Sequence, residues 1–248
     1  MSRIRGARRL AAAAVCCCAT VAAAPAHAET DAGLQPSFVP DALGASTAFT
    51  LAFGLHVGLE GVPPPTSRIV VHLPAGLGID LRAVAGCAVS RLRSAGAGGC
   101  PGRSLIGSGH AVVEVHAGSQ SIPEQATIRV FRGPDRSGRP TIAILSRGDT
   151  PLQEQTVSTA TLAADRSPYG YRLTVSIPPI PTVAYEPDAS IVSLSLTIGT
   201  VAGRPRAHAA AGTITVPRHC PAGGFPFAAE FAFADETTAA ASARVRCP

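Results

Sequence analysis

The sequence predicts an all-β fold: an antiparallel β-sandwich of about ten strands with one short helical segment near residues 80–95. Apolar and polar residues alternate with a period of two in many short runs, which is the pattern of strands that bury one face. Turn-forming residues separate these runs, since 25 glycines and 22 prolines occur among the 248 residues. Only one stretch shows helical spacing, so helical and α/β classes are disfavoured.

About ten runs carry the strand signal. The alternation is clearest in residues 50–60, 69–73, 171–177 and 192–198. Weaker runs predict strands near residues 108–116, 125–132, 140–146, 154–163 and 211–216. Phe227, Phe231 and Phe233 then face a last strand across a turn at residues 235–238. This turn predicts a terminal hairpin in which Phe231 lies near residue 242.

The helical segment near residues 80–95 has a recognisable start. Asp80 can cap it, because an aspartate side chain accepts hydrogen bonds from the first free backbone N–H groups of a helix. Gly86 is expected to divide the segment into two short pieces.

Residues 1–28 have the organisation of a cleaved secretory signal peptide. Four arginines precede an apolar run, and Ala26-His27-Ala28 supplies small residues for cleavage. The apolar run is too short for a permanent anchor. We therefore expect a secreted or envelope-associated mature protein without a transmembrane segment. It has an extended segment at 29–46 and one β domain at 47–248, or alternatively two β subdomains divided near 117–124.

The charge of the chain argues against nucleic acid as a partner. All 21 basic residues are arginines, and four belong to the predicted signal peptide, which leaves 17 arginines against 16 acids. Nucleic-acid binding requires a concentrated basic surface, which this balance does not supply. The absence of lysine also excludes Schiff-base chemistry and a phosphate-binding P-loop.

Four cysteines follow the signal peptide: Cys87, Cys100, Cys220 and Cys247. An even number in an exported chain indicates two disulfides, for which three pairings exist. The short separations favour Cys87–Cys100 and Cys220–Cys247. Neither pair has the close spacing typical of zinc ligands.

Metal and hydrolase motifs are weak. His110, Glu114 and His116 share one face of a predicted strand, but the two histidines lie nearly 20 Å apart at about 3.3 Å per residue. Only Glu114 and His116 can share a metal ion, and two ligands seldom suffice. Ser108 lies between glycines without the spacing of a nucleophile elbow. We expect no metal and no other cofactor.

Binding is better supported than catalysis, although aromatic platforms for sugars or bases are disfavoured because tryptophan is absent. Five arginines surround a predicted hairpin turn at 133–138: Arg129, Arg132, Arg136, Arg139 and Arg147. They either bind the phosphate or carboxylate of an envelope polymer or lipid headgroup, or are ordinary solvated charges. The apolar, proline-rich segment 177–187 is either a docking strip or a stiff crossover between sheets.

Three stretches carry a resemblance. They are Cys87…Cys100-Pro101-x-x-Ser104-x-Ile106-Gly107-Ser108-Gly109, residues 115–124 and residues 177–190. Over about residues 36–220 the chain resembles an uncharacterised family of secreted actinobacterial proteins. The resemblance implies a secreted β-sandwich with a Cys…Cys-Pro element, and it implies no activity and no catalytic residue.

The function predicted from these patterns is a binding or structural role outside the cell or in the cell envelope. The expected partner is an envelope polymer or another envelope protein. The alternative is a secreted hydrolase with a dispersed active site.

Overall fold

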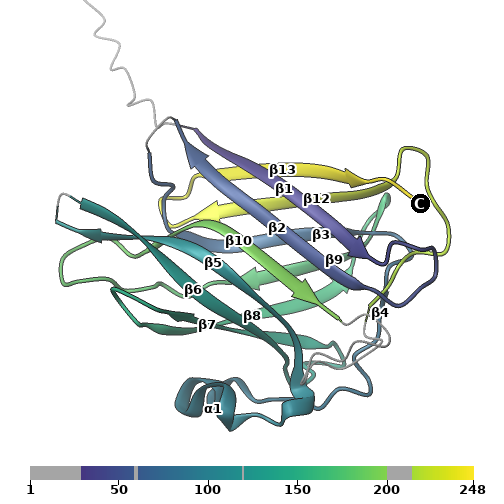
Figure 1. The fold of residues 1–248 in the computed structure, drawn as a ribbon, viewed down its shortest axis with the longest axis horizontal. Helices are drawn as coiled ribbons and strands as arrows, with labels where there is room; N and C mark the ends of the chain where they lie inside the picture. The colour runs from purple at the N-terminus through teal and green to yellow at the C-terminus, as the bar shows by residue number, and fades with distance from the viewer. Residues whose placement is uncertain (1–28, 59–60, 119, 200–213) are drawn as a thin grey trace, which may run out of the picture.

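The structure, a computed structural model, describes residues 29–58, 61–118, 120–199 and 214–248 (Figure 1). The predicted signal peptide and the start of the strand predicted at 211–216 lie outside these ranges. The elements in chain order are β1 (Thr30–Val39), β2 (Ala48–Val57), β3 (Thr66–Pro74), β4 (Gly78–Ile79), α1 (Val89–Ala95), η1 (Gly96–Gly99), η2 (Gly102–Ser104), β5 (Leu105–Ala117), β6 (Gln120–Arg132), β7 (Thr141–Gly148), β8 (Gln155–Ala164), β9 (Tyr169–Ser176), β10 (Ser190–Ile198), β11 (Ile214–Thr215), β12 (Phe225–Phe233) and β13 (Thr238–Val245).

Eleven antiparallel strands form one sheet in the order β1-β2-β10-β5-β6-β7-β8-β9-β3-β12-β13, and β4 pairs with β11 beside it. The predicted all-β antiparallel class is therefore confirmed. The first and last strands of the order, β1 and β13, also lie against each other, so the sheet rolls up until its edges meet (Figure 1). The two layers expected of a sandwich are two halves of this rolled sheet.

The period-two alternation places one face of every long strand inside the roll. In β2, Phe49, Leu51, Phe53 and Leu55 are buried, while the residues between them are more exposed. Successive side chains of a strand point to opposite faces, so the inward residues of all strands meet in one core. That core is apolar and extends from β1 to β12.

Phenylalanines gather where the two edges of the sheet meet. Phe49 of β2 stacks on Phe227 of β12, with ring centroids 5.5 Å apart. Phe38 of β1 packs on Phe49 and, edge to face, on Phe225. Such pairs stabilise by about 0.5–1.5 kcal/mol beyond simple burial. Aromatic packing thus joins the N-terminal strands to the C-terminal hairpin.

The segment expected to be extended, residues 29–46, contains β1. The alternation of burial continues through Gly33 and Pro36, but both residue types are rare in strands and conceal β1 in the sequence. Proline is tolerated at the edge of a sheet, where its missing N–H costs no ladder hydrogen bond. β1 has its one ladder with β2, so it occupies such an edge.

The terminal hairpin forms, but its predicted register is wrong. Phe231 lies opposite Ala239 instead of residue 242. The turn is tighter than expected, because the Phe233 N–H donates to the Thr237 carbonyl at 3.0 Å. Glu236 adopts a positive φ of 69° to close it.

The predicted helical segment forms only in its second half, as α1. Asp80 does not cap it, since the residue before α1 is Ala88. Asp80 instead accepts hydrogen bonds from the backbone N–H and the guanidinium of Arg82, and the side-chain bond lowers its pKa to about 2. Residues 80–88 are not helical because the Cys87 N–H donates to the Arg132 carbonyl of β6 at 2.8 Å. None of the helices in the described ranges is long and apolar enough to cross a membrane.

The alternative domain boundary near 117–124 coincides with the hairpin that joins β5 to β6. These two strands pair from Leu105 to Ala117. The residues on either side of the hairpin tip therefore belong to the same sheet.

Candidate functional site

The rolled sheet encloses a cavity of about 110 Å³. Inward-facing residues of β2, β3 and β5–β10 form its wall, and the β7–β8 and β9–β10 loops close one end. A smaller apolar cavity of about 60 Å³ lies next to it, with Leu51, Val71, Leu173 and Leu196 in both walls. The two cavities together form an apolar space along the inside of the sheet.

Two glutamates line this apolar space, the buried Glu124 and the exposed Glu154. Glu124 of β6 is only 2% exposed and lines the larger cavity. Its Oε2 accepts a hydrogen bond from the Leu152 backbone N–H at 3.0 Å. Its Oε1 lies over Gly148, where a β-carbon would be 1.9 Å away, so glycine leaves room for the carboxyl group.

The polar groups of the cavity are confined to one corner. Ser146, Thr156 and Ser158 line the wall on the neighbouring strands β7 and β8. Ser146 lies opposite Thr156 in the ladder and opposite Ile128 of β6 on its other side. A molecule inside the cavity would therefore meet aliphatic carbon on most sides and oxygen atoms at the Glu124 corner.

The proline-rich segment 177–189 closes the cavity near this corner. It crosses from β9 to β10, which belong to one rolled sheet rather than to the two sheets of the predicted crossover, and its Ile177 and Ile180 line the wall. The Ala189 N–H donates to the Ile180 carbonyl at 2.8 Å. The Gly118 N–H donates to Glu186 Oε1 at 3.1 Å, which fastens the segment to the β5–β6 tip.

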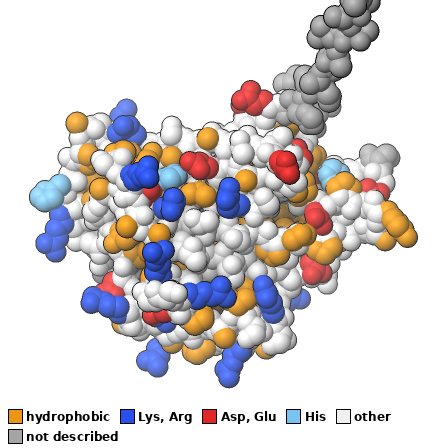
Figure 2. All heavy atoms as spheres, turned by 180° about the vertical axis from the view of Figure 1, so that it is seen from behind, with side chains coloured by type: hydrophobic (Ala, Val, Ile, Leu, Met, Phe, Trp, Pro, Cys, Tyr) orange, Lys and Arg blue, Asp and Glu red, His pale blue; other side chains and the backbone are white. Residues whose placement is uncertain are grey.

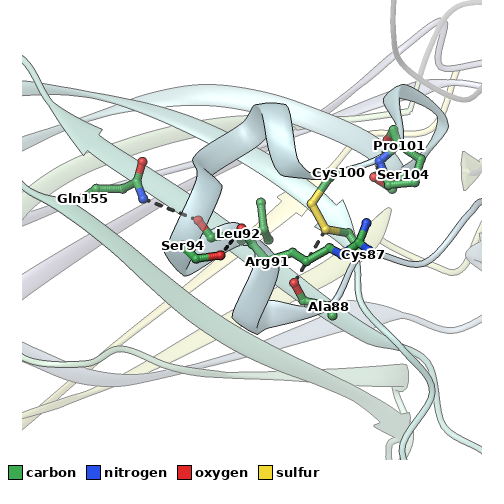
Figure 3. Close-up of a disulfide and its surroundings, with 9 residues drawn as sticks. All are labelled: Cys87, Ala88, Arg91, Leu92, Ser94, Cys100, Pro101, Ser104 and Gln155. Atoms are coloured by element: carbon green, nitrogen blue, oxygen red, sulfur yellow. Dashed lines mark hydrogen bonds between the residues drawn. A yellow bond between two sulfur atoms is a disulfide. The ribbon is translucent and has the colours of Figure 1, made fainter.

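A second, smaller core lies on the outward face of β6–β8. Leu92 of α1 packs there with Phe131, Leu145 and Val157. The Cys87–Cys100 disulfide closes the loop that carries α1, and Gln155 of β8 donates to the Leu92 carbonyl at 3.4 Å (Figure 3). The disulfide and this hydrogen bond hold the loop over the sheet.

Both predicted disulfide pairings occur in the structure. Cys87 and Cys100 have Cα atoms 5.4 Å apart, and those of Cys220 and Cys247 are 6.0 Å apart. Both separations lie within the normal range for a disulfide. The second bridge ties the end of β13 to the segment before β12.

Two grooves flank the α1 loop on the outward face, and Arg129 of β6 lines both of them. The first groove, of about 820 Å³, also contains Arg147 of β7. The second, of about 800 Å³, contains Ser108 and His110 of β5. Within the described residues no carboxylate lines this second groove, so Ser108 and His110 lack the acidic member of a catalytic triad.

The structure divides the five arginines that are candidates either for anion binding or for ordinary solvated charges. Arg129 and Arg147 are exposed and share the first groove. Arg132 donates to Asp135 at 2.8 Å. Arg136 and Arg139 pair through their backbones at the hairpin turn, away from that groove. The hairpin is therefore not a single basic cluster.

The weak metal candidates lie on the outward face of β5. Glu114 accepts a hydrogen bond from Ser121 at 2.6 Å, which occupies one of its oxygens. In the part of the chain that the structure describes, no group of three or more side chains is arranged to hold a metal ion.

A histidine cluster on the outward face was not predicted. His72 of β3 contacts Asp165 Oδ2 through Nδ1 at 2.5 Å and Glu230 Oε1 through Nε2 at 3.4 Å. Burial alone raises the pKa of Asp165, but the hydrogen bonds from His72 and the Arg166 N–H outweigh it and lower that pKa. A histidine oriented by an aspartate is one half of a hydrolase triad. In such a triad the other ring nitrogen, Nε2, faces the nucleophile, whereas here it faces the carboxylate of Glu230. The hydrolase alternative therefore stays a prediction.

The surface seen from behind bears arginines spread across it (Figure 2). Apolar, neutral and acidic side chains lie between them (Figure 2). The chain matches no protein-family model, and neither a curated protein nor a solved structure is detectably similar to it. The cavity and the grooves are therefore the features of the molecule that indicate a function.

Proposed function

We propose that the protein binds a small, mainly aliphatic molecule inside its rolled sheet, with a polar group of that molecule at Glu124. The cavity carries this proposal, because it combines an apolar wall with one buried carboxyl group. The predicted binding role thereby acquires a location and a ligand class.

The size of the cavity supports a ligand. Protein interiors contain few voids larger than a water molecule. An unfilled cavity destabilises by roughly 24 cal/mol per Å³, so 110 Å³ corresponds to about 2.6 kcal/mol. Binding of an apolar molecule would recover that free energy, and an engineered apolar cavity of about 150 Å³ does bind benzene.

The polar corner supports a preference among apolar ligands. Glu124 has one oxygen held by the Leu152 N–H, and the other faces the cavity over Gly148. A hydroxyl or amine at one end of an aliphatic ligand can donate to it. A ligand without such a group would leave the carboxyl group with fewer hydrogen bonds, which is costly in a buried site.

We also propose that this binding takes place outside the cytoplasm. The two disulfides support this location, because disulfides persist in oxidising compartments. The signal-peptide pattern of residues 1–28 is the second support.

The test compares hexanol with hexane, with binding followed by heteronuclear NMR. We expect both to shift the resonances of the cavity wall, and hexanol to bind more tightly. Ala126→Leu fills the cavity and should abolish both interactions, because Ala126 lines the wall and is buried. Ala240→Leu makes the same change on the exposed face of β13 and should leave them intact.

Loss of the hexanol preference in Glu124→Leu would assign the preference to the carboxyl group. If Ala126→Leu and the unchanged protein bind hexanol equally, the interior is not the binding site and the proposal is wrong.

A further inference from the structure

Arg129 and Arg147 present two exposed guanidinium groups to one groove. Arg129 lies opposite Leu145 in the β6–β7 ladder, and Thr127 lies opposite Arg147. The two arginines are therefore diagonal neighbours on the outward face, about 7–8 Å apart at the backbone. In the described part of the chain neither forms an ion pair.

The one acidic residue among the described lining of the two grooves is Asp149. Its N–H donates to the Gln125 carbonyl at 3.0 Å, which places it at the end of β7. Gln125 precedes Arg129 by four residues, about 13 Å along an extended strand. The charge of Arg129 is therefore not cancelled locally by Asp149.

Hydroxyl and amide groups surround Arg129. Thr127, Ser108 and Thr197 lie near it across the β10–β5–β6 part of the sheet, since Ser108 is the ladder partner of both Arg129 and Thr197. The other groove adds Gln153 and Gln155. Aromatic rings are scarce among the described lining residues: Phe131 is 3% exposed, and the imidazole of His110 is the one exposed ring.

We infer that these grooves bind a phosphate group carried on a polyhydroxy chain, that is, a sugar or polyol phosphate. Two guanidinium groups suit phosphate oxygens, which they can contact in pairs. The surrounding hydroxyl and amide groups suit the hydroxyls of the chain on either side of the phosphate. This site is on the opposite face of the sheet from Glu124 and is independent of the interior cavity.

Nucleic acid is a poorer fit to the same charges. Single strands bind by stacking successive bases on exposed aromatic faces, and among the described residues these grooves offer the single imidazole of His110 and no exposed Phe, Tyr or Trp. A sugar or polyol phosphate needs no such platform.

The experiment titrates the protein with glycerol phosphate and follows binding by heteronuclear NMR. Inorganic phosphate, glycerol and an oligonucleotide are titrated in parallel. We expect glycerol phosphate to shift resonances of β6 and β7 around Arg129 and to bind more tightly than the other three. Arg129→Gln and Arg147→Gln should each weaken binding about tenfold or more, because each removes a charged hydrogen-bond donor.

Arg136→Gln is the matched control, since it removes the same charge at the hairpin turn, outside the first groove. Equal weakening by Arg136→Gln would show general attraction to positive charge and would overturn the proposal. Equal affinity for inorganic phosphate would overturn the polyhydroxy part, and equal or tighter binding of the oligonucleotide would overturn the ligand class. Arg129 is exposed, so an unchanged melting temperature checks that the variant folds.

Discussion

The inward and outward faces of the rolled sheet bury apolar side chains in different ways. The interior core draws on nearly every long strand, because the two halves of the sheet cover each other. The outer core covers part of β6–β8 and depends on α1, a helix of 7 residues. A helix so short is not stable by itself. Its position therefore depends on Leu92 and on the Cys87–Cys100 bridge.

The two proposed binding sites follow this difference. The interior is apolar with one buried carboxyl group, which suits a small aliphatic ligand. The outward grooves beside the α1 loop are polar and basic, which suits an anion. Changes to the interior should affect the whole fold, whereas changes to the outer core should affect the loop and its grooves.

The largest effect is expected from Phe227→Ala. Phe227 is 1% exposed and stacks on Phe49 where the edges of the sheet meet. Its truncation should lower the free energy of unfolding by about 3–5 kcal/mol. Chemical denaturation measures this loss.

The matched variant is Leu92→Ala in the outer core, where Leu92 is fully buried. We expect it to release the α1 loop and to lower global stability by less than half as much as Phe227→Ala. If both variants destabilise global unfolding equally, the outer core is part of the main folding unit and the contrast is wrong.

An intermediate effect is expected from removing the Cys87–Cys100 bridge with Cys87→Ala and Cys100→Ala together. Loss of a loop closure of this size corresponds to about 3 kcal/mol. Because the loop packs on the outward face alone, hydrogen exchange should accelerate in residues 87–104 and remain slow in β2 and β12.

The corresponding double change at Cys220 and Cys247 gives the comparison. That bridge fastens the end of β13, so its removal should accelerate exchange in the terminal hairpin instead. Identical exchange patterns in the two double variants would contradict the separation of the two regions.

The smallest effect is expected at the outward cluster of His72, Asp165 and Glu230, near which Arg172 also lies. The pKa of Asp165 is lower in the folded protein than in the unfolded chain, so its ionised form stabilises the fold at neutral pH. This contribution is fully present above the unfolded pKa of about 4 and is lost as the pH falls through the lowered folded value.

An acid titration of stability in the unchanged protein and in Asp165→Asn measures this contribution. The variant should be less stable at neutral pH and should lose less stability below pH ~4. If the stability of Asp165→Asn falls with pH in parallel with that of the unchanged protein, ionised Asp165 does not make the expected contribution.

The sequence predicted strands more reliably than their partners. Alternation identified β2 and the consecutive long strands from β5 to β9, because each strand buries every second side chain whatever its neighbours are. The sequence did not predict β1, because Gly33 and Pro36 are poor strand formers. It also predicted a helix cap at Asp80, whereas the residue before α1 is Ala88. The start moved because Cys87 is held by a hydrogen bond to β6, a contact between distant residues.

The candidate sites show the same limit. Glu124 had a detectable signal, since it occupies an inward position of the alternation between Ile122 and Ala126. That pattern cannot show whether the carboxyl group meets a cavity or a packed core. In the sequence, Arg129 and Arg147 are two of five arginines that look alike. The β6–β7 register shows that these two are diagonal neighbours on one face.

Local alternation and short loops are enough to specify the all-β class, most strand positions and the spacing that pairs the cysteines. Contacts between distant segments roll the single sheet, join its edges through Phe38, Phe49 and Phe227, and place Glu124 at a cavity. These features arise from packing between strands far apart in the chain. A period-two pattern specifies which face of a strand is buried, but it does not specify what lies against that face.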